Sequence, residues 1–115
     1  MDISRSRWVW LLQAASGVTL LLLLSLHWVA QHYLASEGLR NFVDVAAYLK
    51  QPLAFTLETA FLIVVSVHAM LGMRAILLDL NLKAEHQRVL DFSLWFIGIG
   101  TVLYGFQLVW QIIHL

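Results

Sequence analysis

The chain has 115 residues, of which 61% are hydrophobic and 12% are charged, and its formal net charge at pH 7 is zero. Soluble domains carry about twice that charged fraction, so the composition excludes an ordinary soluble domain and predicts about three membrane-spanning helices of roughly 20 residues each. The balanced charge gives no indication of nucleic-acid binding, and the absence of cysteine excludes thiolate iron–sulfur ligation, disulfides and covalent haem attachment.

The first predicted span covers residues 8–34 and follows a short polar segment. Its apolar run is too long for a signal-peptide core and lacks a small-residue cleavage site, so we expect the span to be retained. At helical spacing, one face carries Gly17, Leu20, Leu24, His27 and Gln31. This face is small at one end and polar at the other, which predicts that it contacts other helices rather than lipid.

Residues 36–50 are predicted to form a short amphipathic helix in the membrane interface. Ser36 is a suitable N-cap, and Glu37 suits a first helical turn. The apolar face would consist of Leu39, Phe42, Val43, Ala46 and Ala47, with Arg40, Asn41, Asp44 and Tyr48 elsewhere. A charged surface loop is the alternative.

The second predicted span covers residues 52–80. Proline is favourable in the first turn, because the N–H that it lacks has no intrahelical partner there. Glu58 lies about 9 Å along this span at the helical rise per residue. It therefore marks either the outer interface or a polar pocket.

A histidine, a glycine and an arginine toward the end of this span suggest a haem site. His68 lies well inside the apolar run, where an ionisable residue by default marks a functional site. Gly72 lies one turn later on the same face, so a flat, bulky group can approach the backbone there. Arg74, near the water boundary, can pair with a haem propionate. The alternatives are that His68 hydrogen-bonds to a neighbouring helix or lines a polar cavity, and that Arg74 only anchors the helix.

The third predicted span covers residues 89–113 and follows a polar turn at residues 81–88. One side carries Gly98, Thr101 and Gly105, which permits close helix packing. The basic residues of one side of the membrane are Arg5, Arg7, Arg74, Lys83 and Arg88, and those of the other are Arg40 and Lys50. This bias predicts a cytoplasmic N-terminus and an outside C-terminus, in the cytoplasmic membrane of a bacterium or archaeon.

His27 and His68 are predicted to lie at depths that differ by about 15–20 Å at the helical rise. One haem iron cannot take both, so two histidine ligands in this chain would serve two haems, each completed by a partner subunit. His27 is either such a ligand or a plain polar contact. His114 is a poor ligand because chain ends fray, and His32 and His86 are expected to be interfacial residues without a cofactor role.

A haem near the inner face is useful only beside an electron donor or acceptor, and membrane-soluble quinone is the obvious one. Arg74, Asp79 and a partner subunit can form a polar pocket for it. A surface role at the helix end is the alternative for Asp79.

The residues that carry a family resemblance lie in the first two spans. They are Ser16, Gly17, Val18 and His27 in the first span, and His68, Gly72, Arg74 and Asp79 in the second. With three spans, an interfacial segment and a short positive loop in the same order, residues 8–110 resemble the small membrane-anchor subunit (cytochrome b) of succinate dehydrogenases and fumarate reductases. The resemblance implies respiratory complex II of the tricarboxylic acid cycle, in which a flavoprotein oxidises succinate, an iron–sulfur subunit relays electrons, and two anchor subunits bind haem b and quinone.

The resemblance also implies roles for single residues. His68 matches the haem b ligand, His27 matches the outer ligand of members with two haems, and Asp79 matches the aspartate of an Asp-Tyr pair near quinone. Leu80 stands where many members have that tyrosine, so the partner anchor or the iron–sulfur subunit can supply the polar contacts to quinone instead.

We therefore expect an all-α, three-helix integral membrane anchor that binds one or two haems b and helps form a quinone site, without activity of its own. The alternatives are a haem-free membrane interaction or transport protein, in which the histidines are contacts between helices, and the b-type cytochrome subunit of another respiratory dehydrogenase.

Overall fold

The structure is a computed structural model and describes residues 3–33 and 41–115. Its helices in these ranges are α1 (Ile3–His32), α2 (Phe42–Leu49), α3 (Pro52–Leu78) and α4 (Ala84–Ile113), and the described residues form no strand. Three of the helices contain stretches long and apolar enough to cross a membrane: Arg7–His32, Pro52–Leu78 and Ala84–Ile113. The predicted all-α, three-helix architecture is confirmed.

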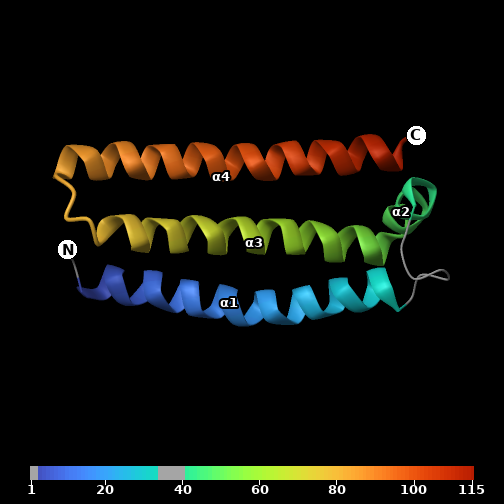
Figure 1. Cartoon of the computed structure of the whole chain (residues 1–115), viewed down its shortest axis with the longest axis horizontal. Helices are drawn as coiled ribbons and strands as arrows, with labels where there is room; N and C mark the ends of the chain where they lie inside the picture. The colour runs from blue at the N-terminus through green and yellow to red at the C-terminus, as the bar shows by residue number, and fades with distance from the viewer. Residues whose placement is uncertain (1–2, 34–40) are drawn as a thin grey trace.

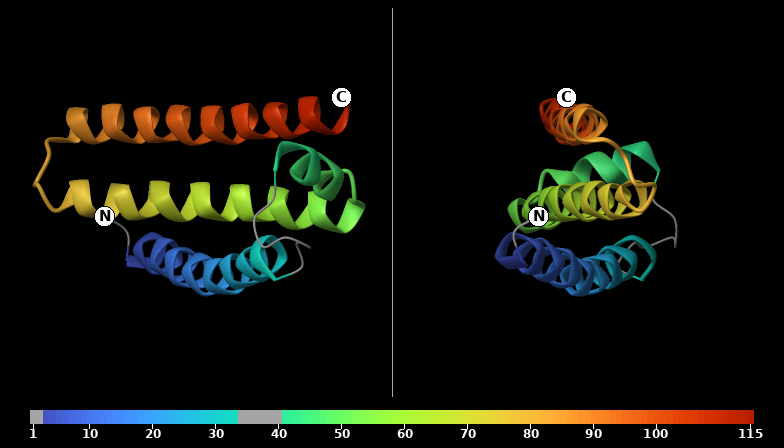
Figure 2. Two further views of the ribbon diagram at one scale, coloured as in Figure 1. Left: turned by 45° about the vertical axis from the view of Figure 1, so that its right-hand side comes forward. Right: turned by 90° about the vertical axis from the view of Figure 1, so that its left-hand side faces the viewer.

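The three long helices lie side by side in a row, with α3 in the middle (Figures 1 and 2). Helix α3 contacts both α1 and α4, whereas no Cα atoms of α1 and α4 in the described residues come within 8 Å of each other. The short helix α2 lies at the end of the row where the C-terminus is found, and it packs on α3 and α4. The start of α1 and the α3–α4 loop lie at the opposite end. Each of the three long helices can therefore cross a membrane, with one end on each side.

The helix boundaries differ from the sequence prediction at the start of the third span. Helix α4 begins at Ala84 rather than at residue 89, because Glu85 suits the positive end of the helix dipole in its first turn. The predicted polar turn at residues 81–88 was therefore too long. Asn81 turns the chain with a φ of 54°, a left-handed conformation that asparagine tolerates better than most residues.

Helix α2 begins at Phe42, after an N-cap formed by Asn41, whose side chain accepts the backbone N–H of Asp44 at 2.9 Å. The predicted cap at Ser36 and the first turn at Glu37 lie outside the described residues. Two residues of the predicted apolar face, Phe42 and Val43, are exposed. The prediction for Tyr48 was wrong: the side chain that we placed away from the apolar face is buried, together with Leu49, against the long helices.

Small residues let the helices approach closely. A Cβ atom on Gly98 would lie 3.0 Å from Cγ of Met70, and one on Gly105 would lie 2.8 Å from Cδ2 of Leu62. Thr101, predicted for the same side, is exposed and donates its hydroxyl proton to the carbonyl of Ile97. The close helix packing predicted for the two glycines is thus confirmed, with α3 as the neighbour, and the threonine has no part in it.

The inward face predicted for the first span is largely confirmed. Gly17, His27 and Gln31 all contact residues of α3. Leu24, predicted for the same face, is exposed.

Candidate functional site

His68 projects from α3 against the backbone of α1. Its Nδ1 atom lies 3.0 Å from Oγ of Ser16, and Ser16 is buried, with 8% of its surface exposed. A Cβ atom on Gly17 would lie 3.2 Å from Cε1 of His68, so a larger residue there would push the ring slightly away from α1. The Ser-Gly pair that the sequence singled out in the first span is therefore the surface on which the imidazole rests.

The space beside Gly72 is filled by α1. A Cβ atom on Gly72 would lie 3.1 Å from Nε2 of Gln13. The side-chain Oε1 atom of Gln13 is buried and has no hydrogen-bond partner among the described residues. Sequence reasoning missed Gln13, although its signal was available: it is a polar residue four positions before Gly17, and so on the same face of the first span.

Arg74 forms an ion pair with Asp91 at the start of α4. Its Nε donates to Oδ1 at 2.7 Å, and one terminal nitrogen lies 3.5 Å from Oδ2. Sequence reasoning also missed Asp91, because a helix period does not reveal which helices are neighbours. Asp79, which we expected near Arg74, is exposed at the C-terminal end of α3 and has no ion pair with it.

A cavity of about 310 Å³ opens between α3 and α4 next to this ion pair. Arg74 and Asp91 lie at its polar end, and most of its remaining lining is apolar. Asp79 is not part of the lining.

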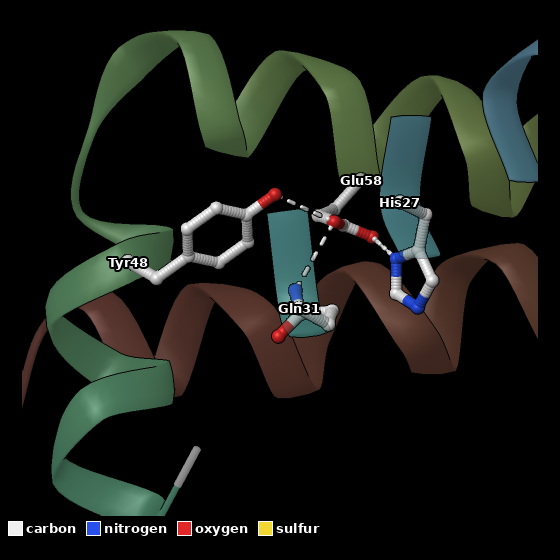
Figure 3. Close-up of polar contacts among 4 residues, drawn as sticks. All are labelled: His27, Gln31, Tyr48 and Glu58. Carbon is white, nitrogen blue, oxygen red and sulfur yellow. Dashed lines mark hydrogen bonds and ion pairs between the residues drawn. The ribbon is translucent and has the colours of Figure 1, made fainter. Parts of the chain in front are cut away.

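A second polar cluster lies at the other end of the row, near α2 (Figure 3). Glu58 of α3 stands at its centre and is bound through Oε2 to Nδ1 of His27 at 2.7 Å. Tyr48 of α2 donates its hydroxyl to Oε1 at 2.8 Å, and Nε2 of Gln31 lies 3.5 Å from the same oxygen. The ring of His27 stacks on Phe61, with 5.0 Å between centroids. Of the two alternatives for Glu58, the structure places it in a polar pocket.

The sequence family of the chain is clear from two comparisons. Residues 3–108 match the family model described as succinate dehydrogenase/fumarate reductase transmembrane subunit. The chain belongs to this family. It is also 30% identical, over 103 residues, to the succinate dehydrogenase hydrophobic membrane anchor subunit of Archaeoglobus fulgidus, an alignment that covers 90% of this chain and 87% of that protein. No solved structure matches the chain significantly.

The anchor is thus a multi-pass membrane subunit of an oxidoreductase complex. It has two separate polar clusters, one formed by Ser16, His68, Arg74 and Asp91 and the other formed around Glu58. Glu58, which holds His27, lies ten residues before His68 on the same helix, and ten residues span about 15 Å. In the described part of the chain, no three His, Asp or Glu side chains converge on one possible metal position. His27 and His68 therefore belong to separate groups of polar contacts along the row of helices.

The other three histidines of the anchor are exposed. The ring of His32 lies 5.4 Å from that of Trp28, and Nδ1 of His114 lies 2.8 Å from the carbonyl oxygen of Trp110. His86 lies in the first turns of α4. No hydrogen bond or ring contact joins any of the three to His27, His68 or Glu58 among the described residues.

Proposed function

We propose that this anchor subunit binds haem b through His68, with the second axial ligand from a second anchor subunit. Together the two anchors would hold an iron–sulfur and a flavoprotein subunit at the membrane and help to form a quinone site. When bound, haem b supplies one-electron transfer. The observation that carries the proposal is the state of the His68 ring, which is held at one nitrogen and free at the other.

The ring fits the role of an axial ligand for two reasons. Nδ1 is bound to Ser16, while Nε2 has no hydrogen-bond partner among the described residues. Iron-ligating histidines characteristically use one nitrogen for the metal and the other for an outer partner. Gly17 and Ser16 fix the ring against α1, so the free nitrogen is held in one place.

Arg74 can donate a further hydrogen bond to an anionic or carbonyl oxygen while it keeps its ion pair with Asp91. A guanidinium has five N–H donors, and the contacts to Asp91 engage two of its nitrogens. A propionate or a quinone oxygen can take a remaining donor. In this proposal Asp91 orients Arg74.

The cavity between α3 and α4 is a candidate for this chain's part of the quinone site, because Arg74 lines it. Its volume of about 310 Å³ is at the lower end of the range for small-molecule pockets. An apolar wall with one polar end suits a ring that carries carbonyl oxygens and an apolar tail. The role of Asp79 in quinone binding stays a prediction from the resemblance, and Leu80 leaves further polar contacts to partner subunits.

A second haem at His27 is the second candidate. The observation that favours it is that the His27 ring, like that of His68, is hydrogen-bonded through one nitrogen only. Its Nδ1 atom is bound to Glu58, and its Nε2 atom has no hydrogen-bond partner among the described residues. A carboxylate behind a ligating histidine is a common arrangement in metal sites. A plain polar contact between α1 and α3 explains the same bond, so the two must be separated by experiment.

The test is a reduced-minus-oxidised spectrum and a pyridine haemochrome assay on the purified complex. We compare wild type with His68→Ala, His27→Ala and His86→Ala, the last being an exposed histidine outside both clusters. One haem predicts that His68→Ala alone loses the b-type band. If the complex holds two haems, His68→Ala and His27→Ala should each retain roughly half of the wild-type haem b content. A wild-type complex without haem b, or one in which His68→Ala keeps all of it, would overturn the proposal and leave a haem-free anchor.

A further inference from the structure

We propose that Ser16 is the positioning residue of His68. It accepts a hydrogen bond from Nδ1–H of the ring, and so it keeps the lone pair of the ring on Nε2, the nitrogen available to iron. This inference rests on the proposed haem function and adds to it a residue of the first span that acts through the ligand rather than on the haem.

The direction of the hydrogen bonds follows from counting protons. A serine hydroxyl has one proton and can accept two further hydrogen bonds. Oγ of Ser16 donates that proton to the main-chain carbonyl oxygen of Gln13 at 2.8 Å. The contact of 3.0 Å between Oγ and Nδ1 of His68 must then use a proton from the imidazole.

This assignment fixes the tautomer of the ring. A neutral imidazole carries one proton, and when Nδ1 holds it, Nε2 has the lone pair. That tautomer is the one a metal ion needs at Nε2. If Ser16 instead donated to Nδ1, the proton of the ring would sit on Nε2 and would have to leave before a bond to iron formed.

The surroundings make the arrangement rigid. Ser16 is buried, at 8% exposure, so water does not compete for its hydroxyl. Its bond to Gln13, three residues earlier on the same helix, holds the hydroxyl in one rotamer. Gly17 lets the ring approach, since a Cβ atom there would lie 3.2 Å from Cε1. Position and tautomer are therefore set by neighbouring residues of α1.

The hydrogen bond has a measurable consequence for a bound haem. An acceptor on the outer nitrogen makes a ligating histidine more basic, and loss of such a partner typically weakens metal binding by about 10- to 100-fold. A more basic ligand favours ferric over ferrous iron. If Ser16→Ala weakens the ferric form tenfold more than the ferrous form, the midpoint potential rises by about 59 mV, the equivalent of a tenfold change for one electron.

The experiment uses the purified complex and two readouts, namely a redox titration of the b-type absorbance and the rate at which haem transfers to excess apomyoglobin. Ser16→Ala is expected to raise the midpoint potential and to speed haem loss by about tenfold or more. Ser16→Thr keeps a hydroxyl that can bond to the preceding turn and is expected to restore both values. If the alanine variant does not assemble, Ser16→Cys, whose sulfur is a weak acceptor, must shift the potential in the same direction.

The matched control is Ser25→Ala. Ser25 lies on the same helix and donates to the carbonyl of Leu21 at 2.7 Å, so its removal deletes the same kind of bond away from His68. Wild-type potential and haem retention in Ser16→Ala, with haem lost in His68→Ala, would overturn the role of Ser16 and leave the haem proposal standing. Unchanged haem in His68→Ala would overturn both.

Discussion

Glu58 is the residue on which three helices converge. Its carboxylate is 12% exposed and meets His27 of α1, Tyr48 of α2 and Gln31 of α1. A carboxylate inside a membrane span is stable only where donors surround it. Three polar side chains from α1 and α2 surround the carboxylate here. The cluster therefore connects the short helix α2 to α1 and α3, the helices before and after it in the sequence.

The strength of this tie can be measured with a double-mutant cycle. Tyr48→Phe removes one donor, and we expect it to lower the free energy of unfolding by about 1 kcal/mol. In a Glu58→Ala background the same change should cost less. The difference between the two costs is the coupling energy, which we expect to be about 0.6 kcal/mol, the average found for hydrogen bonds between membrane helices. The measurement is unfolding in mixed detergent micelles, followed by circular dichroism.

The control for that cycle is Tyr104→Phe. Tyr104 is exposed on α4 and has no hydrogen bond within the described part of the chain, so its substitution should leave stability unchanged. Equal effects of Tyr48→Phe in the presence and absence of Glu58 would contradict the hydrogen bond as the source of stability.

The sequence predicted the residues of these sites better than their partners. His27, Gln31 and Gly17 were assigned to the inward face from helical period alone, and the structure agrees. Tyr48 was placed wrongly, because a short amphipathic pattern treats a hydroxyl as an outward group when its acceptor lies on another helix. Asp91 and Gln13 were missed for the same reason: a period identifies the face of a helix but not the residue that faces it.

At the scale of elements, α3 and α4 pack through glycines. The Cβ atom that a substitution would add at Gly105 lies 2.8 Å from Cδ2 and 3.1 Å from Cδ1 of Leu62. These are the ends of a flexible side chain, which can rotate at some cost. Gly100, five residues earlier on α4, has no atom within 4 Å of the same position. The two glycines thus differ in what they face and not in the helix that holds them.

We expect Gly105→Ala to destabilise the anchor by about 1–2 kcal/mol, toward the lower part of the range for overpacked cores because Leu62 can move. Gly100→Ala creates no contact, and its effect should be neutral or stabilising, since alanine is the better helix former. Thermal unfolding of the purified complex in detergent measures both. Leu62→Ala removes the crowded methyl groups, so adding Gly105→Ala to it should cost less than in wild type. Equal costs in the two backgrounds would contradict the clash.

Helix boundaries followed less exactly from the sequence than helix faces. The polar residues from Glu85 to Arg88 looked like a loop because they interrupt the apolar run, yet they form the first turns of α4. Helix ends outside the membrane core can be polar without ending the helix. Pro52, in contrast, marks the start of α3 as predicted, because its ring limits the backbone directly.

At the scale of the whole molecule, the row of helices gathers positive charge at one end. Arg7 of α1, Arg74 of α3, and Lys83 and Arg88 around the α3–α4 loop all belong to that end, whereas Lys50 lies at the end with α2. The order of the row, with α3 in the middle, was not predicted, because all three spans are apolar enough on several sides to occupy that place. The charge asymmetry was predicted and does not depend on that order.

We propose that the end with the α3–α4 loop faces the cytoplasm, because basic residues remain on that side during insertion. The chain has no cysteine, so a single introduced cysteine is the only thiol of this subunit that a maleimide can label. Glu85→Cys, in an exposed first turn of α4, removes a negative charge and leaves the basic residues intact. Leu115→Cys places the thiol at the other end, on a residue that is 75% exposed. In intact cells or spheroplasts, a membrane-impermeant maleimide should label Leu115→Cys and should label Glu85→Cys only after the membrane is made permeable. The reverse pattern would place His68, the proposed haem ligand, and the Arg74–Asp91 pair near the outer surface, and the proposed iron–sulfur subunit would then have to dock at the end that carries α2.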